Sequence, residues 1–595
     1  MKLFRYGIYL ISVLVPLGLL VDSKAIFYSG ADWSTHLWLI AYFGEHFRHY
    51  LGMPTVLTAA PSVGMAVPLF YGYLLYPILG FFSAFIGASL ALRLGCLLMM
   101  ALQFYALYCA GRAAFRHRGL AYAAAVTVIW STYALTDLYN RSAIPEYFAT
   151  GFLMAAIGFT VAAAADSGEG SPRFHAWLAG VSVLLAMGMH PPTAVVSGVF
   201  FAALGAVISA VWIYHYRRLR WSGIALGFAG AAFGLLILSP WFYITLRIGP
   251  KLLIWGGPNT LLFYPDRCDS WFGRLSPVPY DWLSVHKGID VSTPYLEAPI
   301  AFGGLILVGW FLAIWMRSSR PAVPATDNLW AGSARFVAPL ALGWFGFLLA
   351  LSLSLPLATH FQFLGPYLQF AYRLVSHCNA ALATAVFAAG ALACQRGALA
   401  GRRHQADVIA AVCITMAALA MILKLTHGSP VAVDQGSPEY ALGGDRAPLI
   451  ASGLPYLIEY YTTPAAIPAL PDGEAPGATR MSFPVGQKGS KFGQVETTQV
   501  RLDQPGWVVT NALVFPWSRI WVNGRRSGGD DLRRQGSFLA VHLPAGTANL
   551  RWEWHPDPVW SCLHTISQIA FICVMLVTTF WFVARGLASW ARHKT

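Results

Sequence analysis

Long apolar stretches follow one another along this 595-residue chain, and they limit what it can fold into. About 17–25 apolar residues cross the hydrocarbon core of a bilayer as one helix. Because the backbone finds no water in that core, such stretches restrict the chain to packed transmembrane helices. Charged residues make up only 11% of the sequence, against about 25% in soluble domains. We therefore predict an all-α polytopic membrane protein with about twelve transmembrane helices, at residues 6–22, 84–110, 119–136, 145–165, 176–190, 193–213, 222–246, 298–316, 335–356, 379–394, 408–425 and 561–584.

The arrangement of basic residues predicts how these helices are oriented. With the N-terminus inside, every basic cluster in a short loop falls on the inner side, as the positive-inside rule requires. The net charge of +14 therefore indicates membrane orientation and not nucleic-acid binding. Counting the Gly-, Pro- and Tyr-rich segment 66–83 as a span would place one cluster outside, so we predict an interfacial or re-entrant piece there. The inner clusters are Arg112, Arg116 and Arg118; Arg173; Arg217, Arg218 and Arg220; Arg317 and Arg320; Arg396, Arg402 and Arg403; and Arg585, Arg592 and Lys594.

The longer polar segments gather on the outer side in this topology. This topology requires that the N-terminal segment stays uncleaved and forms the first span. Residues 1–25 also resemble a signal peptide. The outer segments carry most of the acidic residues and the loop tryptophans. For a bacterial inner (cell) membrane this side is the periplasm, and we expect the active face there. The outer segments are 23–83, 137–144, 191–192, 247–297, 357–378 and 426–560.

Residues 426–560 differ from the rest of the chain. Turn signals such as Asn523-Gly524 separate short runs in which polar and apolar residues alternate, as in half-buried strands. We predict a periplasmic, sandwich-like all-β domain here, after a transmembrane domain (1–425) and before the last helix with its cytoplasmic tail (561–595). The predicted strands are 494–502, 507–513, 519–523, 538–543 and 549–554.

A carboxylate and an imidazole mark the first outer segment. Asp32 and His36 lie four residues apart, just after the first predicted span, and aromatic residues surround them. This is the spacing of neighbours on one face of a helix. One interpretation is a solvated loop in which Asp32 caps a helix that begins near Ser34. The other is a catalytic base, Asp32, just outside the bilayer.

A second polar group opens the predicted span 145–165. Pro145 suits the first turn of a helix, and Glu146 favours the same helix end through the dipole. The structural interpretation makes Glu146 a helix-end charge and Arg141 an interfacial anchor. The functional interpretation lets Arg141 bind a phosphate or Glu146, with Tyr139 beside it, because ionisable residues at membrane depth indicate a functional site.

Further polar side chains lie on the same outer side. His190 precedes two prolines between spans, and Arg373 follows an aromatic segment before the tenth span. A lone interfacial histidine is commonly structural, and Arg373 either extends to the headgroups or binds a phosphate bidentately. Loop 247–297 combines tryptophans with charges of both signs, which suits a sugar phosphate or an ordinary aromatic belt.

Several well-defined motifs are missing from the sequence. It contains no Walker A, GxGxxG or HExxH motif in a fitting context, no GxSxG nucleophile elbow, and no CxxC or Cys/His pair with zinc spacing. We therefore expect no cofactor, and nothing in the sequence supports a divalent metal.

The motifs described above resemble those of GT-C superfamily membrane glycosyltransferases. The resemblance rests on Asp32 and His36 with the Gly/Pro/Tyr-rich loop after them. Tyr139, Arg141, Pro145 and Glu146, with His190-Pro191 and Tyr372-Arg373, are similar to a bacterial membrane protein family labelled 6-pyruvoyl-tetrahydropterin-synthase-related. The segment from Trp507 to Gly546 is similar to β-domains of related bacterial membrane proteins.

This resemblance implies an inverting transferase that moves a sugar from a polyprenyl-phosphate donor to a glycan, lipid or protein acceptor. Asp32 would be the general base, with Glu146 as the second catalytic candidate. Residues that would bind substrate are His36, Tyr139, Arg141, His190 and Arg373. The first loop lacks the Asp-x-Asp of the family pattern, which leaves metal dependence open. The alternatives are a transporter or flippase, or a non-catalytic assembly protein, for lipid-linked glycans.

Overall fold

A computed structural model of the chain places most of its residues. The description below covers residues 33–59, 62–131, 134, 137–138, 143–165, 172–216, 221–252, 298–318, 329–353, 373–396, 398–427, 462–471, 474, 477–484 and 495–594.

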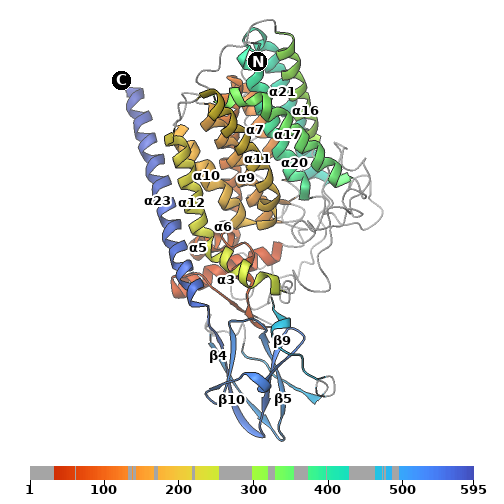
Figure 1. The fold of residues 1–595 in the computed structure, drawn as a ribbon, viewed down its shortest axis with the longest axis vertical. Coiled ribbons are helices and arrows are strands. Elements are labelled where there is room, and N and C mark those ends of the chain that lie inside the picture. Colours follow the sequence, from red (N-terminus) through yellow and green to blue (C-terminus); the bar gives the residue numbers. More distant parts are fainter. Residues whose placement is uncertain are drawn as a thin grey trace.

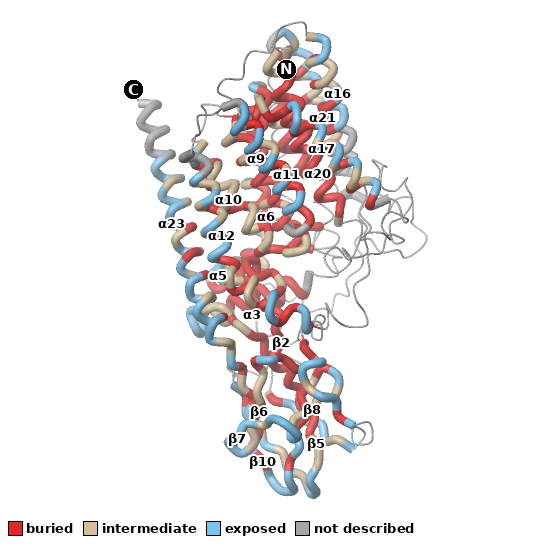
Figure 2. Tube along the Cα trace, viewed as in Figure 1, coloured by how far each residue is buried: buried red, intermediate tan, exposed pale blue. Residues whose placement is uncertain are grey.

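The molecule has two parts, a bundle of helices and a small β-domain that extends from one end of the bundle (Figure 1). Figure 2 shows that buried residues run through the bundle and continue into the adjoining part of the β-domain. One hydrophobic cluster joins Trp38 and Tyr76 of the bundle to Val508 and Trp552 of the β-domain. The two parts therefore share a hydrophobic core where they meet.

Long apolar helices build the bundle. Seven helices in the described part of the chain are long and apolar enough to cross a membrane, so the chain is a multi-pass membrane protein. The predicted span 6–22 lies outside the described residues, and the total of about twelve stays a prediction. The seven are α6 (Ala88–Phe115), α9 (Ile144–Ala165), α11 (Pro191–Tyr216), α12 (Trp221–Arg247), α17 (Leu329–Leu353), α20 (Leu374–Gln395) and α23 (Pro558–Lys594). The bundle also contains α10 (Pro172–Met189), α16 (Ala298–Met316) and α21 (Arg403–His427).

One predicted span is shorter than expected. Helix α7 covers Arg118–Ile129, whereas the hydropathy pattern predicted 119–136. The hydroxyl of Ser131 accepts a hydrogen bond from the Ala134 backbone N–H at 3.2 Å. Such a local bond from a serine offers the backbone an alternative to the helical ladder. Apolar composition therefore overestimated the length of this helix.

The first outer segment holds more regular structure than a loop. It contains α3 (Trp33–Tyr50), a hairpin of β1 (Leu57–Ala59) and β2 (Ser62–Met65), α4 (Val67–Phe70) and α5 (Leu75–Ile86). Gly87 separates α5 from α6, and its φ of 90° is one that glycine adopts without a steric penalty. The segment 66–83, expected not to span, thus forms two short helices.

Two sheets form the β-domain. The six-stranded sheet has the order β1-β2-β5-β9-β8 with β3 beside β5, and the four-stranded sheet has the order β4-β10-β6-β7. All five predicted strands are present within a few residues of their expected bounds. Val63 of the first outer segment lies opposite Ala512, so β2 extends the sheet of the β-domain. The strands are β3 (Thr479–Arg480), β4 (Val495–Leu502), β5 (Gly506–Leu513), β6 (Ser518–Val522), β7 (Arg525–Arg526), β8 (Leu532–Gln535), β9 (Phe538–Leu543) and β10 (Gly546–Trp554).

Basic residues mark the end of the bundle that is far from the β-domain. The Arg396 guanidinium donates to the Trp315 carbonyl oxygen at 2.9 Å, and His117 Nε2 lies 3.7 Å from an Asp407 oxygen. The first contact joins the ends of α16 and α20, and the second joins the starts of α7 and α21. At the opposite end, Arg247 lies 3.6 Å from Asp557, just before α23 leaves the β-domain. That the short basic loops lie on the inner side stays a prediction.

Candidate active site

A buried ion pair lies at the β-domain end of the bundle. Glu146 stands in the first turn of α9, and Arg373 directly precedes α20. Arg373 Nε is 3.4 Å from Glu146 Oε2, and the side chains are 17% and 2% exposed. A carboxylate buried this deeply needs a partner, because an isolated buried charge costs several kcal/mol. The arginine meets that need and keeps part of its side chain accessible.

The same helix end holds a second polar contact. His377, one turn into α20, has Nδ1 2.8 Å from the Ser197 hydroxyl of α11, and both side chains are buried. Helices α9 and α20 therefore begin beside each other, and the second turn of α11 contacts the first turn of α20. Helix N-termini carry partial positive charge, which favours an anion.

Two further buried polar residues belong to the same end of the bundle. His190 immediately precedes α11, and its Nδ1 is 2.8 Å from the Thr193 hydroxyl. Its contact with its own helix start fits the structural interpretation of this histidine. Asp137 lies between α7 and α9 and is only 1% exposed.

His36 occupies a packed helix and not a solvated loop. It lies on α3, is 1% exposed, and has Nδ1 2.7 Å from the Tyr76 hydroxyl. The rings of Tyr71 and Tyr76 stack on it at 6.2 and 6.1 Å. A helix begins near Ser34 as the first interpretation expected, but its expectation of a solvated position is wrong, because apolar side chains of α3 and α5 pack together and enclose the imidazole.

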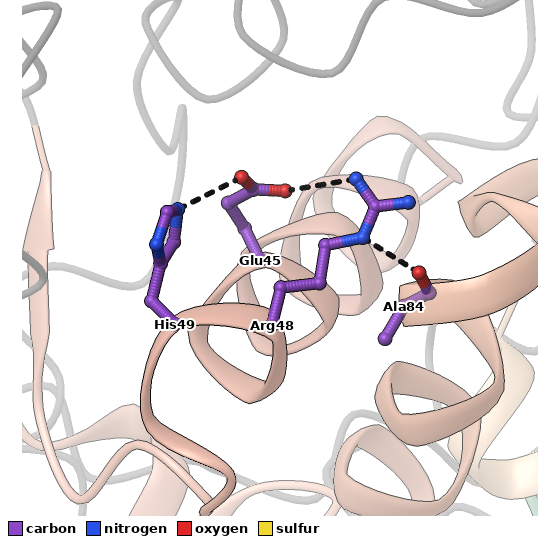
Figure 3. Close-up of polar contacts among 4 residues, drawn as sticks. All are labelled: Glu45, Arg48, His49 and Ala84. Atoms are coloured by element: carbon purple, nitrogen blue, oxygen red, sulfur yellow. Dashed lines mark hydrogen bonds and ion pairs between the residues drawn. The ribbon is translucent and has the colours of Figure 1, made fainter.

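The far end of α3 is fastened to α5. Arg48 Nε donates to the Ala84 carbonyl oxygen at 2.6 Å, and Glu45 pairs with both Arg48 and His49 (Figure 3). These contacts hold α3 in place by its C-terminal turn. A residue at the start of α3 therefore projects from a fixed helix.

Three of the predicted site residues, Asp32, Tyr139 and Arg141, lie outside the described residues, as does most of loop 247–297. Their roles stay predictions. The structure brings Glu146 and Arg373 together, where the sequence had suggested Arg141 as a partner of Glu146. His36 belongs to the separate α3–α5 cluster.

Sequence reasoning missed His377 and Ser197. The signal for His377 was its position four residues after Arg373, which places both on one helix face. Ser197 carried no signal, because a serine inside an apolar run is common in membrane helices.

No group of three His, Cys, Asp or Glu side chains suited to a metal ion occurs among the described residues. Asp32 lies outside them, and the expectation of no cofactor stays a prediction.

No protein-family model matches the sequence, and no curated protein matches it either. Solved structures of similar shape include the arabinofuranosyltransferase AftD from Mycobacteria, with 18% identity and a TM-score of 0.39. That match covers 71% of this chain and 27% of AftD, so the chain spans about a quarter of the length of that protein.

Two other structures are similar over more of their own length. The archaeal oligosaccharyltransferase AglB from Archaeoglobus fulgidus, in complex with an inhibitory peptide and a dolichol-phosphate, has 15% identity and a TM-score of 0.38, over 78% of this chain and 60% of AglB. ArnT from Cupriavidus metallidurans bound to undecaprenyl phosphate has 14% identity and a TM-score of 0.40, over 90% and 98%. Similarities of this size assign neither a family nor an activity to the chain.

Proposed function

We propose that the protein is an integral membrane glycosyltransferase that takes a sugar from a polyprenyl-phosphate donor at the β-domain end of the bundle. The observation that carries the proposal is the buried Glu146–Arg373 pair where α9 and α20 begin, beside the Ser197–His377 contact with α11. An inverting reaction and the bacterial periplasm as its location are further parts of the proposal.

The donor explains why a charged pair would lie at this depth. A polyprenyl phosphate keeps its chain in the bilayer, so its phosphate must be bound near the membrane surface. Arg373 offers the planar donors that suit a phosphate, and Glu146 holds its Nε side. The helix N-termini add partial positive charge toward the same anion. In this proposal Arg373 binds the phosphate, and Glu146 positions Arg373.

The acceptor hydroxyl would attack the anomeric carbon as the bond from that carbon to the phosphate oxygen breaks. The proton of the hydroxyl passes to a general base, and the polyprenyl phosphate leaves as an anion that needs no protonation. We assign the base to Asp32, next to the start of α3, whose far end is fastened to α5. General-base catalysis is worth about 10²–10⁴ in rate, and stabilisation of the leaving phosphate adds to it.

The other predicted residues keep supporting roles in the proposal. Tyr139 and Arg141 would contact the substrates. The buried His36 and His190, which contact Tyr76 and Thr193, would hold the first turns of α3 and α11 in place. Glu146 remains the second candidate for the base.

A transfer assay tests the proposal. Purified protein is given a panel of polyprenyl-phosphate sugars with membrane glycolipid extract, and product formation is compared with that of Asp32→Asn and Arg373→Lys. Lysine preserves the charge beside Glu146 but loses the bidentate donors. We expect a loss of about 10²–10⁴ for Asp32→Asn. For Arg373→Lys we expect a loss of about tenfold or more.

The matched control is Arg335→Lys, because Arg335 is an exposed arginine on α17. It should leave turnover unchanged. Full turnover in Arg373→Lys would remove the phosphate assignment, and full turnover in Asp32→Asn would move the base to Glu146. Absence of turnover with every donor would favour the transporter or assembly alternatives.

A further inference from the structure

The four-stranded sheet turns one face to the core of the β-domain and the other to solvent. On β10, Ala548, Leu550, Trp552 and Trp554 are buried, while Asn549 and Arg551, which alternate with them, are exposed. Successive side chains of a strand point to opposite faces of its sheet. The outer face is therefore polar, although the inner face belongs to the hydrophobic core.

Strand register brings side chains of three strands together on this outer face. Arg551 of β10 lies directly opposite Trp521 of β6 and opposite Thr497 of β4. Asn549 lies opposite Gln499. Directly opposed residues share a face, with Cβ atoms about 4.5–5.5 Å apart. Together these residues line a hollow of about 720 Å³, which is within the roughly 300–1,000 Å³ typical of small-molecule sites.

The tryptophan in the hollow is held in place. Trp521 Nε1 donates to Glu553 Oε2 at 2.9 Å, and Arg551 Nη2 lies 3.4 Å from Glu553 Oε1. A ring that is already ordered loses little conformational freedom when a ligand packs on it. An indole also offers a large apolar surface beside a polar edge.

The outer face carries an excess of positive charge. Arg501 and Arg519 share it by strand alternation, and Arg526 shares it because it lies opposite Trp521. With Arg551 they make four arginines, and Glu553 is the one carboxylate that the described strands of this sheet place there. A face of this charge suits an anionic ligand.

We propose that this face of the β-domain binds an acidic oligosaccharide, one that carries carboxylate or phosphate groups. Trp521 would pack on the apolar face of a sugar ring, Gln499, Asn549 and Thr497 would bond its hydroxyls, and Arg551 would bind the acidic group. The proposal deepens the proposed transferase function and rests on it, because the oligosaccharide would be the acceptor. A hollow with amide and hydroxyl groups on its walls fits a sugar chain better than a flat lipid surface.

Direct binding tests this site without reference to catalysis. The full chain in lipid nanodiscs is titrated with tetragalacturonate and with the methyl ester of the same tetrasaccharide, which is its neutral counterpart. We expect the acidic form to bind at least about tenfold more tightly than the ester. Trp521→Ala should weaken binding by about tenfold or more, since a buried aromatic anchor contributes this much at a binding site.

The matched control is Trp507→Ala, because Trp507 is a half-buried tryptophan on the other sheet that contacts His542. It should bind as the wild type does, and so should Arg373→Lys, whatever its transferase activity. Three results would overturn the proposal: no binding of tetragalacturonate at about 10 mM, equal binding by Trp521→Ala, or binding of anionic vesicles in place of the oligosaccharide. Absence of transferase turnover together with intact binding of tetragalacturonate would count against the proposed transferase function and not against this binding site.

Discussion

Two ion pairs, one in the bundle and one in the β-domain, have the same separation and very different surroundings. Arg373 and Glu146 lie 3.4 Å apart with side-chain exposures of 17% and 2%. Arg551 and Glu553 also lie 3.4 Å apart, with exposures of 51% and 23%. Water screens the second pair, and little of it reaches the first. The comparison teaches that burial, and not distance, decides what a charged contact does for a protein.

The largest effect should come from breaking the buried pair. Arg373→Ala removes the arginine from beside the buried Glu146 carboxylate, and breaking a buried pair in this way costs about 3–5 kcal/mol of stability. Arg551→Ala removes an exposed pair worth about 0–1 kcal/mol. Thermal unfolding in detergent micelles measures both. Equal losses of stability in the two variants would show that burial does not decide how much an ion pair contributes.

Packing gives a second contrast of intermediate size. A Cβ atom on Gly180 of α10 would collide with the backbone carbonyl of Gly227 on α12, because small residues let membrane helices approach closely. Gly180→Ala should therefore cost about 1–3 kcal/mol.

Gly528 of the β-domain is the matched control for this substitution. It has extended backbone, and a Cβ atom there would meet no described atom within 4 Å. Gly528→Ala should leave the unfolding temperature unchanged. If Gly528→Ala lost as much stability as Gly180→Ala, the loss would come from replacing any glycine and not from the contact between the two helices.

A buried carboxyl in the β-domain extends the comparison to the pH dependence of stability. Burial raises the pKa of Glu496 on β4 from 4.5 to about 7. Between these values the unfolded chain releases its proton while the folded chain keeps it. Stability from this group is therefore complete below about pH 4.5 and is lost as the pH rises to about 7.

Glu496→Gln should remove this part of the pH dependence. The difference in unfolding temperature between variant and wild type should grow from pH 4.5 to 7.5 in favour of glutamine. The control is Glu553→Gln, because Glu553 is the more exposed carboxylate on the same sheet. A constant difference across this range would contradict the burial of Glu496.

Periodic patterns predicted most of the regular elements. Alternation located β5, β9 and β10 within a few residues, because one face of each strand meets the core. Hydropathy located α9 and α12, because a span must be apolar along its whole length. The same rule failed for α7, which ends at Ile129. The hydropathy rule also missed α3, because it searches for membrane spans. The apolar residues of α3 are buried against neighbouring elements.

The candidate site was predictable only in part. Glu146 stood out because a carboxylate at the start of an apolar helix is unusual, and Arg373 stood out as an arginine beside a span. The sequence could not predict that Glu146 and Arg373 pair with each other, because their contact depends on how two helices far apart in sequence pack.

The sequence alone was enough to establish a multi-pass membrane protein with a β-rich segment before its last helix, since water and lipid select residues by local pattern. Only the tertiary structure joined Val63 to the sheet of the β-domain, Ser197 to His377, and Trp521 to Arg551 across their strands. Such contacts depend on how elements pack and pair, and local periodicity does not specify which elements become neighbours.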